Sequence, residues 1–201
     1  MMEDSKPHVL FHGQQDDEQI LYIIRPHPIR LALTTLFAGM AGLCLGAVGL
    51  FLADRIDLAS RFGIEFSGLR IAIGLIAGLL SLLLWYWQLY IYNNSRSFIT
   101  DRRFVRIEPS FPLFITKRAL FWNEVAKVKA YAPSLLFRFM KVGTLQFQPT
   151  ITPLEDVRVG YVYYYEDLAN YIDKILFKQK SNPAEIREIR PFVTKPKGER
   201  Y

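Results

Sequence analysis

Two apolar runs near the beginning of the chain constrain its fold more than any other feature. Residues 31–53 and 71–92 each contain about 22 residues and no Lys, Arg, Asp or Glu. As a helix, such a run is roughly 33 Å long, which matches the roughly 30 Å hydrocarbon core of a bilayer. The sequence therefore predicts a hairpin of two transmembrane helices over residues 31–92, joined by residues 54–70.

The flanking charges predict how this hairpin is oriented. Three arginines in the connecting loop are balanced by three acidic residues, whereas more arginines lie at the two ends of the hairpin. These are Arg25, Arg30, Arg96, Arg102, Arg103 and Arg106. Because cytoplasmic flanks carry the excess of Lys and Arg, we expect a multi-pass protein of the inner (cytoplasmic) membrane with both termini in the cytoplasm. The 30 residues before the first run are too long and too acidic for the n-region of a cleavable signal, so we expect the run to remain as an anchor.

Small residues recur four apart in both runs and predict close helix packing. Gly42 and Gly46 follow Ala38 in the first run, and Gly74 and Gly78 lie in the second. Such spacing lets two backbones approach, either within the hairpin or between protomers, although glycine is also common in membrane helices generally. Because neither run contains an ionisable residue, the pattern does not favour a transport pathway.

The segment after the hairpin has the pattern of a small β-rich domain. In residues 95–178, short β-prone runs are separated by turn signals, and residues 143–148 alternate with Leu145 and Phe147 on one face. The period then changes to that of a helix over residues 166–178, with Leu168, Ile172, Ile175 and Leu176 on one side. We therefore expect an α+β membrane protein, in which the hairpin carries a β-sandwich or barrel capped by a C-terminal helix.

Five short stretches together resemble the pattern of a known family: YIIRPH at 22–27, ITDRR at 99–103, EVAKV at 124–128, KVGTL at 141–145 and DLA at 167–169. In this order they resemble bacterial membrane proteins that have two spans followed by a pleckstrin-homology-like domain. The resemblance covers about residues 19–178, and the proline-bearing segments 109–112 and 149–156 depart from the family pattern. It implies a curved sandwich of about seven strands capped by one helix, and it implies no catalytic residues.

Basic residues near the hairpin are the candidate contacts for a membrane surface. They are Arg25, His27, Arg96, Arg102, Arg103, Arg106 and Lys117. Anionic headgroups attract such side chains by ~1 kcal/mol each. For residues 25–28 the alternative is an ordered approach to the helix that docks on the domain, and for Arg103 it is an ion pair with an acidic neighbour that fixes the turn.

Other candidate chemistries have ordinary structural explanations. His8 and His12 have a helical metal-ligand spacing, but Pro7 and Gly13 argue against a helix there. The single cysteine, Cys44, lies in the first run and cannot form an internal disulfide. The alternation of the tyrosines at 161 and 163–165 is expected to place some in the core and others under the closing helix, rather than against nucleic acid. We expect no metal, cofactor, nucleic acid or small-molecule substrate.

The remaining segments, 1–30 and 179–201, are expected to lie outside the compact domain. The first is an N-terminal cytoplasmic segment whose acidic pair, Asp16 and Asp17, is expected to be solvated. The second is proline-bearing, basic and without periodicity, and we expect a flexible tail.

These patterns predict a non-enzymatic scaffold or assembly module at the cytoplasmic face of the membrane. Its expected partners are membrane lipids and either copies of itself or another protein. The alternatives are a sensor of anionic lipid that uses Arg102, Arg103, Arg106 and Lys117, and an accessory subunit of an export or envelope complex.

Overall fold

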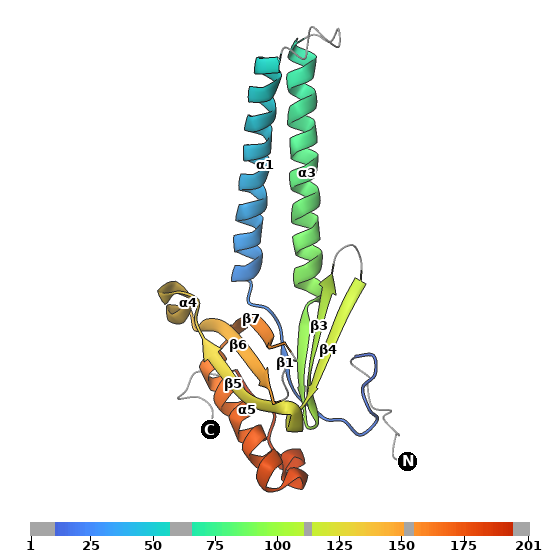
Figure 1. The fold of residues 1–201 in the computed structure, drawn as a ribbon, viewed down its shortest axis with the longest axis vertical. Coiled ribbons are helices and arrows are strands. Elements are labelled where there is room, and N and C mark those ends of the chain that lie inside the picture. Colours follow the sequence, from blue (N-terminus) through green and yellow to red (C-terminus); the bar gives the residue numbers. More distant parts are fainter. Residues whose placement is uncertain (1–10, 57–65, 111–113, 151–154, 195–201) are drawn as a thin grey trace, which may run out of the picture. The chain divides into compact units, whose positions relative to one another are not determined.

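The chain forms two compact units. The computed structural model describes residues 11–56, 66–110, 114–150 and 155–194 (Figure 1). One unit is helical and covers residues 28–94, and the other combines residues 1–27 with residues 95–201. The α+β class expected from the sequence is confirmed, because the described residues form two long apolar helices and two antiparallel sheets.

The helical unit consists of α1 (Ile29–Ile56) and α3 (Phe66–Asn94). The segments Ile29–Leu52 and Arg70–Asn94 are long and apolar enough to cross a membrane. Their large apolar side chains are mostly exposed, for example Leu43 at 77% and Leu75 at 69%.

Small residues line the contact between α1 and α3. A Cβ atom on Gly42 would lie 2.6 Å from the Ser81 Cβ, and one on Gly46 would lie 3.6 Å from the Ala77 Cβ. The Ser81 hydroxyl donates a hydrogen bond of 3.0 Å to the Ala38 carbonyl. Close approach and an interhelical hydrogen bond therefore join the two helices at this stripe.

The glycines of the second run are not in this stripe. A Cβ atom on Gly74 or Gly78 would meet no atom within 4 Å, so α3 presents Ala77 and Ser81 to α1 instead. Of the four glycines predicted to pack, Gly42 and Gly46 lie in the hairpin contact. On α3, Ala77 and Ser81 are the small residues that allow the two helices to approach closely.

The second unit contains two antiparallel sheets. The first has the order β1 (Ile20–Ile24), β2 (Arg96–Thr100), β3 (Arg103–Ser110) and β4 (Phe114–Phe121). The second has the order β5 (Val125–Tyr131), β6 (Val142–Pro149) and β7 (Val157–Tyr163). The short helices are η1 (Trp122–Glu124), α4 (Leu135–Phe139) and η2 (Pro183–Glu188), and the longer helix α5 is Tyr165–Ser181.

The first strand precedes α1 in the chain. Its pairing with β2 places Ile24 opposite Ser97, so part of the segment expected to be separate belongs to the domain. The chain leaves β1 for α1 through residues 25–28 and returns from α3 to β2 through Ser95. The helical unit is thus inserted between two neighbouring strands.

Side chains from both sheets and α5 form the core. The rings of Phe104 and Phe147 stack with centroids 4.0 Å apart, and Leu145 and Phe147 are fully buried as their alternation predicted. The predicted apolar face of the closing helix is also buried, including Leu168 and Ile172. These contacts hold α5 against the sheets.

The segment after α5 differs from the flexible tail expected from sequence. Helix α5 continues to Ser181, and Ile186 and Ile189 are buried in the core at 2% and 6% exposure. The Phe192 backbone N–H donates to the Leu21 carbonyl at 3.2 Å. Because only a few apolar residues make this contact, the segment has no helical or strand periodicity that would have predicted it. Residues 195–201 lie outside the described part.

Strand register gives the domain two distinguishable ends. At one end, β1 finishes at Ile24 and β2 begins at Arg96. We call it the junction end, because the chain connects to α1 and α3 there. We call the far end the one at which β2 turns into β3, through residues 101–102. The length of β2 separates them by roughly 16 Å at about 3.3 Å per residue.

Candidate functional site

At the far end, a buried ion pair ties the N-terminal loop to the β2–β3 turn. Arg103 donates to Glu18 from Nε at 2.9 Å and from Nη2 at 2.7 Å. The Glu18 side chain is completely buried, and the Arg103 side chain is 11% exposed. Glu18 also accepts hydrogen bonds from the Thr100 hydroxyl at 2.9 Å and the Gln15 backbone N–H at 3.1 Å. Such fork-like pairing fixes orientation as well as charge.

The ionisation of this pair follows from its surroundings. Burial opposes the charged form of Glu18, but hydrogen bonds from Arg103, Gln15 and Thr100 outweigh it and lower the Glu18 pKa. The hydrogen bond to Glu18 raises the pKa of Arg103. For the neighbouring Asp101, burial raises the pKa despite a hydrogen bond from the Gln19 N–H. Glu18 and Arg103 are therefore a fully charged, structural pair at neutral pH.

Other basic residues that contact the N-terminal loop also have partners in the domain. Arg102 binds the side chains of Gln15 and Asp17, and Arg187 of η2 binds Asp17 at 2.9 Å. Lys117 donates to the His12 carbonyl and lies 5.3 Å above the centre of the Phe11 ring. Asp17, expected to be simply solvated, is thus an exposed link between the turn and the C-terminal segment.

The candidate lipid contacts consequently differ in their surroundings. Arg102 and Arg103 at the far end, and Lys117 on β4, all bind the N-terminal loop, so for Arg103 the structure shows the ion-pair alternative. Arg106 donates to Glu108 and to the Arg158 carbonyl. Arg25 and Arg96 are exposed at the junction end.

His27 belongs to an ordered connection at the junction end. Its backbone N–H donates to the Tyr161 carbonyl at 2.8 Å, and its ring lies 5.5 Å from that of Tyr163. Burial lowers the pKa of the His27 imidazole. The docked approach weighed for residues 25–28 is therefore the arrangement that the structure contains.

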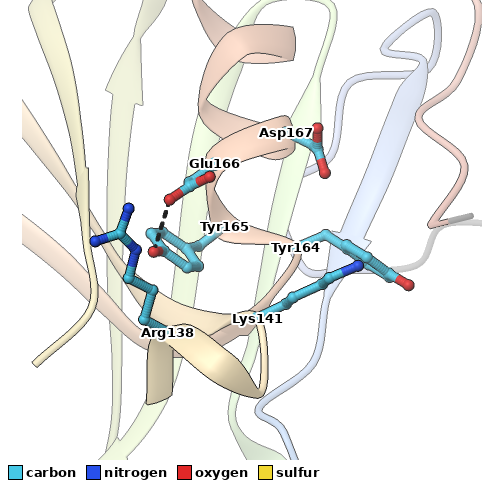
Figure 2. Close-up of a pocket in the computed structure, with 6 residues that line it drawn as sticks. All are labelled: Arg138, Lys141, Tyr164, Tyr165, Glu166 and Asp167. Atoms are coloured by element: carbon cyan, nitrogen blue, oxygen red, sulfur yellow. Dashed lines mark hydrogen bonds between the residues drawn. The ribbon is translucent and has the colours of Figure 1, made fainter. Parts of the chain in front are cut away.

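A pocket of about 300 Å³ opens beside α4 and the first turn of α5 (Figure 2). Its lining consists of Arg138, Lys141, Tyr164, Tyr165, Glu166 and Asp167. The Tyr165 hydroxyl donates to Glu166 at 2.9 Å, and Lys141 lies 5.3 Å above the Tyr164 ring. Burial and the bond to Glu166 raise the pKa of Tyr165. The lining mixes two cations with two carboxylates.

Unusual backbone geometry shapes this pocket. Lys141, Tyr161 and Tyr164 have φ values of 56°, 58° and 50°, a region in which non-glycine residues are uncommon. The Tyr164 N–H donates to the Lys141 carbonyl at 2.8 Å, which joins two of these residues. A Cβ atom on Gly143 would lie 2.4 Å from the Tyr165 ring, so glycine is required where this ring packs.

Sequence reasoning did not find this pocket. Its charged residues come from a five-residue helix, from the residue before β6 and from the first turn of α5, and none of these has a chemical motif. The only local signal is Gly143 within a β-prone run, and it indicates close packing rather than a ligand.

The described residues show no arrangement for metal chemistry. Within residues 11–56, 66–110, 114–150 and 155–194, no group of three His, Cys, Asp or Glu side chains could hold a metal ion. In the same part of the chain, every buried side-chain nitrogen or oxygen has a hydrogen-bond partner. His8 lies outside the described residues. The buried polar groups seen in the structure are therefore satisfied by the protein itself.

Comparisons with protein-family models, with curated proteins and with solved structures find no match for this chain.

Proposed function

We propose that this protein is a non-enzymatic membrane module. In this proposal α1 and α3 cross the inner membrane as a hairpin, with both termini cytoplasmic, and the domain is a pleckstrin-homology-like scaffold or assembly module beside the bilayer. One observation carries the proposal: two long helices with almost wholly exposed apolar surfaces are joined to a domain that has its own buried core.

The exposed helix surface supports the membrane assignment. In water, contiguous apolar patches of more than a few hundred Å² are rare on soluble proteins. Leu79 and Leu82 are each 61% exposed at the middle of α3, and Phe37 and Phe51 on α1 are 65% and 59% exposed. In a bilayer, apolar lipid chains would cover these side chains and remove the free-energy cost of exposing them to water. The arginine distribution favours cytoplasmic termini.

The strand count supports the pleckstrin-homology-like proposal. Among the described residues, four strands and three strands form the two sheets, and a helix of 17 residues follows the last strand. This agrees with the sandwich of about seven strands and one capping helix that the sequence resemblance implies. The position of β1 before the hairpin fits the part of that resemblance carried by residues 22–27.

The charged groups at the far end favour a structural rather than a catalytic role. Glu18 and Arg103 have displaced pKa values, and both displacements arise from a pair that holds the N-terminal loop on the sheet. Displaced values occur in active sites, but ion-pair networks that stabilise a fold produce them too.

Crosslinking in native membranes tests the assembly role. A photoreactive amino acid at the exposed positions Lys129 or Phe177 is expected to yield a discrete oligomer or one defined partner adduct. The matched control is the same amino acid at Leu168, which is fully buried and should give no intermolecular product. A lone monomer under all conditions would contradict the scaffold proposal.

The lipid-sensing alternative requires residues other than those that the sequence predicted for it. Arg102, Arg103 and Lys117 would have to leave partners in the domain before they could bind headgroups. Any lipid contact is therefore better sought at the junction end.

A further inference from the structure

We propose that two exposed apolar tips at the junction end enter the headgroup and acyl-chain boundary of the bilayer. The tips are Leu135, Leu136 and Phe139 of α4 and Phe114 and Ile115 of β4. This inference rests on the proposed membrane anchoring and adds a second, peripheral contact that holds the domain against the lipid surface.

The two tips expose apolar side chains unusually fully. On α4, Leu135 is 83% exposed, Leu136 is 62% exposed and Phe139 is 88% exposed. On β4, the corresponding values are 70% for Phe114 and 63% for Ile115. Three neighbouring large apolar residues on a helix of five are not explained by packing in the domain.

Strand register places the β4 tip at the junction end. Arg96, the first residue of β2, is opposite Ile107 of β3. The β3–β4 hairpin continues beyond that point to the pair Ser110 and Phe114. Phe114 and Ile115 therefore project past the residue at which β2 begins.

A chain of contacts places α4 at the same end. His27 directly precedes the helical unit and hydrogen bonds to Tyr161 at 2.8 Å. The Tyr161 ring contacts the Phe137 ring of α4, with centroids 5.9 Å apart. Figure 1 shows α4 and the β3–β4 tip at one end of the domain and the β2–β3 turn at the other.

The chain connection indicates lipid as the occupant of these tips. Four residues join β1 to α1 and one residue joins α3 to β2, so a bilayer that holds the helices lies close to this end of the domain. Such tethering gives a high effective concentration, and even a weak insertion is then populated.

The charges around α4 agree with an interfacial position. Arg138 lies within α4 and Lys141 is two residues beyond its last residue, and both are exposed. Apolar side chains flanked by Arg and Lys are typical of segments that lie in the headgroup region, where the cations bind lipid phosphate. Arg25 and Arg96 add exposed positive charge at the same end.

Phe177 offers a matched comparison on the same domain. It is 71% exposed, yet it lies twelve residues along α5 from Tyr165, or roughly 18 Å along the helix axis. Tyr165 lines the pocket beside α4, so Phe177 is far from the junction end.

Quenching of a fluorescent label in nanodiscs tests the proposal on the full chain. Cys44, the only cysteine, is first replaced by Cys44→Ser, and an environment-sensitive label is attached in separate variants at Phe139→Cys, Leu135→Cys and Phe177→Cys. The nanodiscs contain phosphatidylethanolamine and phosphatidylglycerol with a nitroxide on the acyl chain, and iodide is the aqueous quencher. We expect nitroxide lipid, and not iodide, to quench the labels at 139 and 135, and iodide alone to quench the label at 177.

The other outcomes separate the inference from the proposed function. If iodide quenches the label at 139 as it does at 177 while the chain copurifies with the nanodiscs, the inference is overturned and anchoring stands. A label at 139 that neither quencher reaches would mean a protein contact, and would also overturn it. A chain that does not copurify with nanodiscs at all would refute the membrane anchoring itself.

Discussion

The two ends of the domain use their residues in opposite ways. At the far end, charged side chains are paired within the chain, as Glu18 and Arg103 are, and the N-terminal loop covers the β2–β3 turn. At the junction end, large apolar side chains such as Phe139 and Phe114 are exposed. The far end is thus satisfied internally, whereas the junction end presents surface that a bilayer would cover.

This difference shows that position in the chain is a poor guide to which residues meet lipid. Arg102 and Arg103 come soon after the second apolar run, but the strand β2 carries them to the opposite end of the sheet. Leu135 and Phe139 come much later, and the β7 contact with His27 brings their helix back to the junction.

The largest expected effect is at the far-end ion pair. Glu18→Ala leaves the Arg103 guanidinium largely buried without its partner, which should cost about 3–5 kcal/mol of unfolding free energy. Denaturant unfolding in mild detergent measures it. The control Asp17→Ala removes an exposed partner of Arg102 and should change the midpoint far less. Equal losses would mean that the pair formed by Glu18 and Arg103 stabilises the fold no more than an exposed ion pair does.

The second prediction concerns packing inside the junction end. Gly143→Ala forces a methyl group into the Tyr165 ring and should destabilise the domain by about 1–3 kcal/mol. Gly160→Ala is the matched control, because its Cβ would meet only the Thr144 hydroxyl at 3.8 Å. Thermal unfolding should separate the two variants clearly, and similar midpoints would contradict the packing described.

A third prediction is the pH dependence of the far-end pair. The folded-state pKa of Glu18 lies below its usual 4.5, so its contribution to stability is present above that pH and is lost as the pH falls through the folded value. The raised pKa of Asp101 acts in the opposite direction. The difference in stability between wild type and Glu18→Gln isolates the first effect and should shrink below pH 4.5; a constant difference would argue against an ionised Glu18.

The smallest effect is expected at the exposed tip of the junction end. Phe139→Ser should change the unfolding free energy by no more than about 0.5 kcal/mol, because the ring is 88% exposed. Phe147→Ser, at a fully buried position, is the contrasting variant and should destabilise strongly. A large loss for Phe139→Ser in detergent would show that this ring supports the fold rather than a surface contact.

Periodicity predicted much of this fold, and three-dimensional pairing explains what it could not predict. The alternation around Leu145 and Phe147 and the apolar face of α5 are strong local patterns. The structure buries these two residues and the apolar face of the helix. The pairing of β1 with β2 crosses 67 residues of helical unit, since residues 28–94 lie between them. No local pattern specifies such a long-range contact, and the same is true of the pair formed by Glu18 and Arg103.

The candidate sites were less predictable than the fold. A charge pattern indicates attraction to anionic lipid, but it does not reveal that Lys117 binds the His12 carbonyl or that Arg187 reaches Asp17. The exposure of α4 likewise could not be predicted, because a short apolar run is equally typical of a buried core segment.

Whether α1 and α3 cross the bilayer is measured by the membrane integration of the full chain. Membranes containing the protein are washed with alkaline carbonate and floated on a density gradient, beside a variant that carries Leu79→Arg and Leu83→Arg on the exposed face of α3. Each central arginine should cost about 2.5–3.5 kcal/mol of insertion free energy, so the variant should leave the lipid fraction in part. We expect the wild-type chain to float with the lipid after the wash, and its release into the soluble fraction would rule out membrane integration.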